Sequence, residues 1–286
     1  MMCIHCQSLN VIKFGFKKRK QRFFCKDCKK LFLDFYNFDR KHYQAEIIAK
    51  VWELYYDGMS YYKIKFYLGS HYNLKRISTS TIFNWVQTYS QLMRRYTDSF
   101  MPKNIGIIHV DETTVILKRE LLANWLNKSW LWVGMDATSR IAYGIHISLE
   151  RDSINAKEFM KRINANPKIV ISDQLHCYKK AIQTRWDGKA KHLQYGGLTK
   201  DITNNCLERL NGTIKDRLKP MRGFCYKHTA KNFFDGFIVY NNVIKPHFSL
   251  DKKTPFEARG INLNLGDNPI LELLKRSVSK CPIPKC

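Results

Sequence analysis

The run IGIIHVDETTVIL, residues 105–117, predicts a β-strand that contains an acidic residue. Asp111 lies inside this run, although Asp is unfavourable in the interior of strands. Glu112 follows it, but adjacent side chains of a strand point to opposite faces of a sheet. We therefore expect only one of these two carboxylates to face a shared site, and Asp111 is the candidate.

The residues after this run alternate between strand and helix patterns. Residues 130–149, WLWVGMDATSRIAYGIHISL, predict two strands joined by a turn at 136–140. Next come a helix at 153–163, a strand at 168–173, a helix at 176–186, a strand near 191–195 and the helix-forming run 204–224. The order β-β-β-α-β-α-β-α predicts an α/β fold in which helices flank a mixed sheet.

Two further Asp residues end strands in this pattern. Asp173 ends the apolar run at 168–173, which is of a buried type and is an unusual place for a simple turn residue. Asp136 is followed by Ala-Thr-Ser-Arg, and Asp commonly starts turns, so we interpret Asp136 as a turn residue. Asp173 therefore joins Asp111 as a candidate site residue.

The run NNCLERLNGTIKDRLKPMRGF, residues 204–224, predicts a helix whose one early acid lacks a local partner. At offsets of three and four residues, Glu208 meets only Asn and Gly, whereas helical carboxylates commonly pair with bases at those offsets. The helix has an apolar arc formed by Leu207, Leu210, Ile214 and Leu218. We expect this arc to pack on the sheet and Glu208 to face the edge that carries the Asp residues.

The three carboxylates predict a metal site. Asp111, Asp173 and Glu208, if held together, would repel one another and have raised pKa values unless cations neutralised them. Oxygen ligands without a neighbouring set of His and Cys favour Mg²⁺ or Mn²⁺.

Two C-x-x-C pairs near the N-terminus predict a second kind of metal site. Cys3 and Cys6 form the first pair, Cys25 and Cys28 the second, and 18 residues separate the pairs. This spacing suits a β-ribbon whose four thiolates hold one structural Zn²⁺, which defines a zinc ribbon at residues 1–36. The alternative is two disulfides, which a reducing compartment disfavours.

A basic segment separates the two cysteine pairs. Its bases are Lys17, Lys18, Arg19, Lys20 and Arg22, and two Phe residues follow. These bases are candidate contacts to a DNA backbone, because phosphates attract Lys and Arg. The alternative is a solvated hairpin tip.

Residues 37–100 predict a domain of three helices. The helices are expected at 43–56, which ends at Asp57-Gly58, at 60–68, which Gly69 closes, and at 79–94, which Ser78 caps. The third helix has an apolar side, formed by Ile82, Trp85, Val86 and Tyr89, and a polar side, formed by Thr79, Ser80, Asn84 and Gln87. The polar side is a candidate for reading the major groove, as in a helix-turn-helix domain. The alternative is a helical spacer with a solvated polar face.

The charge of the chain favours a polyanionic partner. Its 286 residues include 49 Lys and Arg against 24 Asp and Glu, which gives a formal net charge of +25. Such an excess indicates a polyanionic partner, most often nucleic acid, and the alternative is a merely soluble basic surface. The N-terminus lacks the apolar core of a signal peptide, and no run approaches the ~20 apolar residues of a membrane helix. We therefore expect no membrane partner and a cytoplasmic or nucleoid-associated protein.

The acidic residues resemble those of a known family. Asp111, Asp173 and Glu208, with 34 residues between the last two, are similar to the DDE triad of insertion-sequence transposases, which have a retroviral-integrase-type, RNase H-like core. Together with the zinc ribbon and the helix-turn-helix, residues 1 to about 260 resemble insertion-sequence family six and its archaeal relatives.

A downstream motif strengthens the resemblance. The family ending Y-N-x-x-R-P-H…L…T-P-x-E-A is similar to residues 240–247, Leu250 and residues 254–258. Lys245 stands where the family usually has Arg, so the positive charge is kept and the bidentate fork is lost.

The resemblance implies a catalytic core at residues 101–260, followed by a tail at 261–286. Asp111, Asp173 and Glu208 are then expected to hold two Mg²⁺ or Mn²⁺ ions. The implied reaction cleaves DNA at transposon ends and joins the freed 3′-OH ends to target DNA. Because two ends must be brought together, we expect a homodimer or a larger assembly.

Basic residues and histidines near the triad receive further roles from the resemblance. Lys215 matches a basic residue that often lies seven places after the family's Glu, and with Lys219 and Arg222 it is expected to hold DNA. His109 and His176, which lie close in sequence to the two Asp residues of the triad, are candidate neighbours of the metal ligands. The alternative for each is an ordinary packing or surface histidine.

Two other functions fit parts of the sequence. A non-catalytic DNA-binding regulator would use only the zinc ribbon and the helix-turn-helix, but it has no need for carboxylates that face DNA. An RNase H-like nuclease would cleave without joining. Joining of an end oligonucleotide to a plasmid distinguishes these functions from a transposase.

Overall fold

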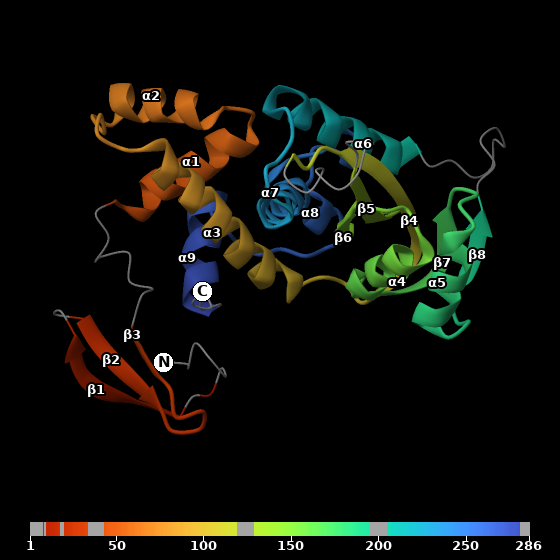
Figure 1. The fold of residues 1–286 in the computed structure, drawn as a ribbon, viewed down its shortest axis with the longest axis horizontal. Coiled ribbons are helices and arrows are strands. Elements are labelled where there is room, and N and C mark those ends of the chain that lie inside the picture. Colours follow the sequence, from red (N-terminus) through yellow and green to blue (C-terminus); the bar gives the residue numbers. More distant parts are fainter. Residues whose placement is uncertain are drawn as a thin grey trace. The chain divides into compact units, whose positions relative to one another are not determined.

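The computed structural model describes residues 8, 10–17, 20–33, 43–118, 129–194 and 205–280, and the chain divides into two compact units. One unit combines the chain up to Tyr96 with the residues from Leu265 onward, and the other spans Thr97–Asn264 (Figure 1). Within the described residues, no helix is long and apolar enough to cross a membrane.

The N-terminal unit begins with a three-stranded antiparallel ribbon. Its strands are β1 (Val11–Lys17), β2 (Lys20–Cys25) and β3 (Leu31–Leu33), in the order β1-β2-β3. Cys25 ends β2 and is buried with Phe23. The ribbon that was predicted between the cysteine pairs is therefore present.

Several residues predicted in this ribbon cannot be placed. Cys3, Cys6, Lys18 and Arg19 lie outside the described residues, so the zinc site stays a prediction. Lys17 and Lys20 pair with each other at the hairpin end of β1 and β2. The guanidinium of Arg22 lies over the ring of Phe14, 5.5 Å from its centroid.

Three helices follow: α1 (Ala45–Tyr56), α2 (Tyr61–His71) and α3 (Thr79–Asp98). The Oγ of Ser60 accepts from the backbone N–H of Lys63, and the Oγ of Ser78 accepts from that of Thr81. Both serines therefore cap helices, as Ser78 was predicted to do.

The prediction that Gly69 closes the second helix was wrong. Leu68 is fully buried, and its carbonyl accepts from the N–H groups of Tyr72 and Leu74, so the helix continues to His71. A single Gly inside a helix costs only about 1 kcal/mol relative to Ala, and the anchoring of Leu68 outweighs that cost.

The third helix has the two sides that its sequence predicts. Ile82, Val86 and Tyr89 are buried, whereas Thr79, Ser80 and Asn84 are exposed and Gln87 is half-buried. The helix is longer than expected, because Tyr96 and Thr97 near its end are also buried.

A helix in the predicted tail completes the N-terminal unit. Helix α9 (Pro269–Lys280) packs against α1, with Lys275 Nζ 3.4 Å from a carboxylate oxygen of Glu46. Leu273 and Leu274 are fully buried. The apolar spacing of this segment was the available signal for an amphipathic helix.

The second unit is built on a five-stranded mixed sheet in the order β6-β5-β4-β7-β8. The strands are β4 (Asn104–Val115), β5 (Ser129–Asp136), β6 (Ala142–Ser148), β7 (Asn166–Ser172) and β8 (Lys191–Gln194). The pairs β4–β5 and β5–β6 are antiparallel, and the pairs β4–β7 and β7–β8 are parallel. The predicted order of elements and the mixed sheet are confirmed.

Helices cover both faces of this sheet. They are α4 (Ser153–Arg162), α5 (Cys177–Trp186), α6 (Asn205–Leu218) and α7 (Lys227–Val239). On one face, the ring of Trp132 in β5 contacts Phe159 of α4 and Tyr178 of α5. On the other face, Asn211 of α6 contacts β4, and Asn242, just after α7, bonds both backbone groups of Ala142 in β6.

The segment after α7 contains the downstream sequence motif. It continues as a π-helical turn (Tyr240–Ile244) and reaches the short helix α8 (Pro255–Ala258). Thr254 and Glu257 form a reciprocal capping box at the start of α8. The Thr-Pro-x-Glu part of the motif is thus explained by helix initiation.

The turn between β5 and β6 confirms the interpretation of Asp136. This carboxylate is buried and accepts from the backbone N–H of Ser139 at 2.8 Å and from its hydroxyl at 2.5 Å. Asp136 therefore stabilises the turn.

Substitution of Gly144 tests how closely β6 packs on α4. A Cβ at Gly144 would lie 2.7 Å from the carbonyl carbon of Arg162. We expect Gly144→Ala to lower the free energy of unfolding by about 1–3 kcal/mol, measured by denaturant titration. Gly212→Ala is the matched control, because no described atom beyond its own stretch of helix lies within 4 Å of its new Cβ. The control should gain about 0.5–1 kcal/mol, and equal stability of Gly144→Ala and wild type would contradict this packing.

Candidate active site

The register of β4 and β7 brings two of the predicted acids level. The last residue pair of these parallel strands is His109 with Ile171. Two residues further along, Asp111 in β4 and Asp173 just after β7 reach the same height at the carboxyl end of β7. Parallel pairing therefore brings Asp111 and Asp173 close together, although 62 positions separate them in sequence.

Three carboxylates form a cluster at this place. Asp111, Glu112 and Asp173 each offer an oxygen, and these oxygens all lie within 4.8 Å of one another. Glu112 is buried, whereas the two Asp residues are half-buried.

The expectation that only one of Asp111 and Glu112 faces a shared site was wrong. Glu112 does lie opposite Trp132, on the face that α4 and α5 cover, while Asp111 faces α6. However, β7 no longer pairs with β4 at this height, so the edge of β4 is open. Both side chains can approach Asp173 around that edge, one from each face of the sheet.

Arg151 links two carboxylates of the cluster. Its guanidinium forms ion pairs with Glu112 and with Asp173, the second with an N–O distance of 3.0 Å, and lies 5.0 Å from the ring centroid of Trp130. The hydroxyl of Tyr178 donates a hydrogen bond to Glu112. Sequence reasoning did not identify Arg151 or Tyr178, since Arg151 lies 22 residues from Asp173 and Tyr178 lies 66 residues from Glu112, the acid that it contacts.

The electrostatics of the cluster follow from burial and mutual repulsion. Burial first, and then the neighbouring Glu112, raise the pKa of Asp111 to about 7. Burial also raises the pKa of Glu112, while Tyr178 and Arg151 oppose that rise. Arg151 thus partly balances the negative charge of the cluster. The ionised form of Asp111 nevertheless remains unfavourable.

Helix α6 contributes an amide to the cluster. The Nδ2 of Asn211 donates to Asp111 Oδ2 at 2.9 Å, and Asn211 Oδ1 is buried without a hydrogen-bond partner among the described residues. The predicted apolar arc of this helix is buried at Leu207, Leu210 and Ile214.

Glu208 lies one helical turn before Asn211 on an exposed part of α6. Within the described chain, the acidic cluster does not include it. Positions three apart on a helix are neighbours, so Glu208 lies on the side of α6 that Asn211 turns toward Asp111.

The predicted histidines and bases of the second unit lie on β4, on α5, and on α6 with the segment that follows it. His109 is buried in β4, and His176 is exposed at the start of α5. Lys215, Lys219 and Arg222 are exposed on α6 and on the segment that follows it.

The residues present fit a divalent cation. Three carboxylates provide hard oxygen ligands, and the unpartnered Asn211 Oδ1 is a further oxygen beside them. The raised pKa of Asp111 reflects burial and the repulsion of neighbouring carboxylates. A bound cation would stabilise the ionised form of Asp111.

Comparison with known families agrees with this arrangement. Residues 107–247 match the model of an IS240-type transposase family that is described as a DDE domain. This matched segment contains all three acids of the predicted triad. The resemblance to insertion-sequence DDE transposases is confirmed.

Comparison with solved structures gives distant similarities. One is to a chain in the cryo-EM structure of the simian T-cell lymphotropic virus intasome in complex with PP2A regulatory subunit B56 gamma, at 12% identity and a TM-score of 0.41, covering 76% of each chain. Another is to the catalytic core domain of BIV integrase, at 16% identity and a TM-score of 0.37, covering 53% of this chain and 91% of that one. None of the curated proteins matches this chain.

The raised pKa of Asp111 predicts how stability depends on pH in the absence of divalent cations. The folded chain keeps a proton on Asp111 up to about pH 7, whereas the unfolded chain releases it near the ordinary value of 3.8. The resulting stability is present below the ordinary pKa and is lost as the pH rises through the folded pKa. Asp111→Asn removes this loss, so above neutral pH its Tm should exceed that of wild type by a few degrees.

Thermal unfolding across the pH range in a chelating buffer measures this difference. Asp216→Asn, an exposed change on α6, serves as the control and should follow wild type. Parallel profiles for wild type and Asp111→Asn would contradict the assignment. Added Mg²⁺ should raise the Tm of wild type more than that of Asp111→Asn.

Proposed function

We propose that this protein is a DDE transposase that binds transposon ends in double-stranded DNA, cleaves them to free 3′-OH groups and joins these to target DNA. The observation that carries the proposal is the level placement of Asp111 and Asp173, within a segment that matches a DDE domain. The net charge of +25 supports a DNA substrate.

Asp111, Asp173 and Glu208 are the residues that would hold two Mg²⁺ or Mn²⁺ ions. Bound divalent ions would activate the attacking oxygen, first of water and then of the 3′-OH, and stabilise the leaving oxygen. The neighbouring Asn211, which contacts Asp111, supports the assignment of Glu208 on the same side of α6.

The chain's own residues prepare this site. Asn211 fixes one oxygen of Asp111, and Tyr178 with Arg151 holds Glu112 in place. His109 and His176 remain candidate neighbours of the ligands. The exposed bases Lys215, Lys219 and Arg222 would hold DNA phosphates near the carboxylates.

The N-terminal elements would recognise the transposon ends. We assign the ribbon at residues 1–36 to a zinc site of Cys3, Cys6, Cys25 and Cys28, with its basic segment against the DNA backbone. The helices of residues 37–100 would form a helix-turn-helix, in which the exposed side of α3 enters the major groove. A homodimer or larger assembly would bring two ends together.

Strand transfer tests the catalytic assignment. Asp111→Asn and Asp173→Asn should each reduce Mg²⁺-dependent joining of an end oligonucleotide to a plasmid by more than about 100-fold, because substitution even of a ligand's neighbour commonly costs 10–100-fold. End binding should survive, since phosphate contacts do not depend on these carboxylates. Asp216→Asn is the control on the same helix as Glu208 and should join normally.

The same assay distinguishes the third ligand and the reaction type. Glu208→Gln should lose joining as fully as Asp111→Asn. Normal joining by Glu208→Gln would contradict the assignment of Glu208 and would indicate that Glu112, which already lies in the cluster, is the third metal ligand. Cleavage by wild type without any joined product would favour a nuclease over a transposase.

Metal analysis tests the zinc ribbon. The purified chain should contain stoichiometric zinc, and Cys25→Ser should lose it together with most of its binding to end DNA. Cys225→Ser, an exposed cysteine of the second unit, should keep both zinc and binding. Full zinc content in Cys25→Ser would eliminate this site.

A further inference from the structure

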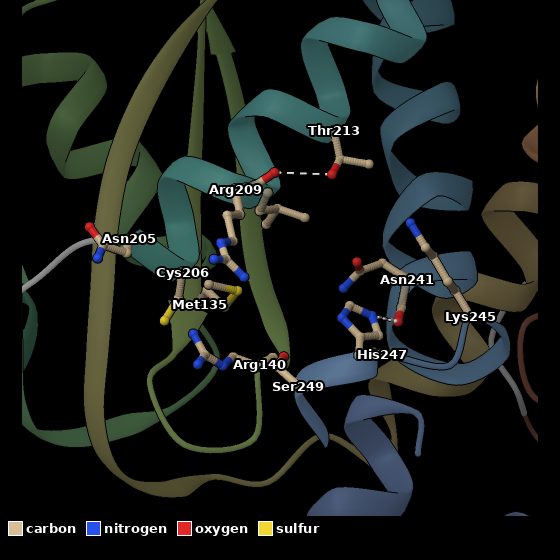
Figure 2. A pocket seen from close by; sticks show the side chains of 11 residues that line it. Met135, Arg140, Asn205, Cys206, Arg209, Thr213, Asn241, Lys245, His247 and Ser249 are labelled. Atoms are coloured by element: carbon tan, nitrogen blue, oxygen red, sulfur yellow. Dashed lines mark hydrogen bonds between the residues drawn. The ribbon is translucent and has the colours of Figure 1, made fainter. Parts of the chain in front are cut away.

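A basic pocket lies beside α6, away from the acidic cluster. Its volume is about 350 Å³, and its lining comes from α6, the turn between β5 and β6, and the segment after α7. The cationic lining residues are Arg140, Arg209 and Lys245, with His247 beside them. Figure 2 shows Arg140 and Arg209 extending toward each other. Lys245 and His247 line the pocket from the segment after α7.

The cations of this pocket form no ion pair with a carboxylate of the described residues. None of the described residues that line it is acidic. The ion pairs between described residues do not include Arg140, Arg209 or Lys245, and Arg140 Nε is buried without a hydrogen-bond partner there. The adjacent carboxylate of Asp136 is already engaged by Ser139.

Burial and neighbouring cations both lower the pKa values of Arg140 and His247. Burial and then Arg209 lower the pKa of Arg140, while the neighbouring Asp136 carboxylate opposes that shift. Burial, with contributions from Lys245 and Arg140, lowers the pKa of His247, against a hydrogen bond to the carbonyl of Asn241. Each of these groups would be stabilised in its charged form by an anion in the pocket.

The fold holds Arg140 in this position at a conformational cost. Arg140 has φ of +63°, a region that is unfavourable for residues with a Cβ, in the turn that Asp136 stabilises. Its backbone N–H donates to the carbonyl of Asp136 at 3.0 Å. The turn therefore places a strained Arg against the pocket.

We propose that this pocket binds a phosphate group of the DNA backbone, as a second contact that is separated from the acidic cluster by α6. Guanidinium groups match phosphate oxygens with two parallel hydrogen bonds, and Lys adds a point charge. The side-chain amide of Asn241, which donates one of its two hydrogens to Asn242, offers a further donor in the lining.

The link to DNA rests on the proposed function and on the two sides of α6. Asn211 on one side contacts Asp111, and Arg209 on another side lines the pocket. A helix with its side chains is about 10–12 Å wide, which corresponds to about three base-pair steps of about 3.4 Å. A DNA strand at the carboxylates therefore has neighbouring phosphates within reach of the pocket.

The salt dependence of DNA binding tests the proposal. Binding of the full chain to a fluorescent end duplex is measured by anisotropy over a range of salt concentrations, without divalent cations. Arg209→Gln and Lys245→Gln should each make the slope of log K against log salt shallower by about 1, as expected for one lost phosphate contact. Lys245→Arg should keep the slope of wild type, since it keeps the positive charge that Lys245→Gln removes.

Lys180→Gln is the matched control, because Lys180 is exposed on α5, on the other face of the sheet. It removes the same charge, and its slope should remain closer to wild type than those of the pocket variants. Slopes of Arg209→Gln and Lys245→Gln equal to that of Lys180→Gln would overturn the proposal. Binding of inorganic phosphate can be measured by calorimetry. The proposal would also be overturned if both pocket variants abolished this binding while their slopes of log K against log salt for DNA stayed equal to that of wild type.

The outcome is separable from that of the proposed function. If wild type joins DNA ends but the pocket variants keep the wild-type slope, the pocket inference fails alone. If the slopes change but wild type shows no Mg²⁺-dependent joining, the pocket stands and the transposase assignment fails.

Discussion

The parallel pairing of β4 with β7 fixes the position of both aspartates at once. Because His109 lies opposite Ile171, Asp111 and Asp173 come level where β7 ends. A shift of one residue in this register would turn Asp111 to the other face of the sheet. The register is held by side chains such as Ile108, which is fully buried, so the hydrophobic core determines where the acids meet.

Charge is distributed around α6 in opposite senses. On one side, three carboxylates lie together with only one described guanidinium, that of Arg151, in ion pairs with them. Arg151 and Tyr178 both bind Glu112. Along another side, arginine and lysine groups gather without carboxylates among the described lining residues. Burial makes the ionised form of Asp111 costly, and burial together with neighbouring cations lowers the pKa values of the half-buried Arg140 and His247. In each case a ligand of opposite charge would relieve the cost. The proposed metal-dependent action on DNA would need both.

Much of the fold follows from local patterns, because a strand or helix with one buried face leaves a period in the sequence. Asp136 was identified as a turn residue for the same reason, since its partner Ser139 is three positions away. The errors have a common cause in contacts between distant segments. Gly69 stays helical because Leu68 is anchored in the core, and Glu112 reaches the cluster because β7 ends beside it.

The order of elements, the acids that interrupt them and the family that they resemble can be read from the amino-acid sequence, because these depend on neighbouring residues and on spacing. Which side chains share a site depends instead on how distant segments pack. Arg151 joins Glu112 and Asp173, and Arg140 meets Arg209, across separations that no local pattern records. Strand register and helix packing set those contacts, since they are fixed by the burial of the whole sheet rather than by any one segment.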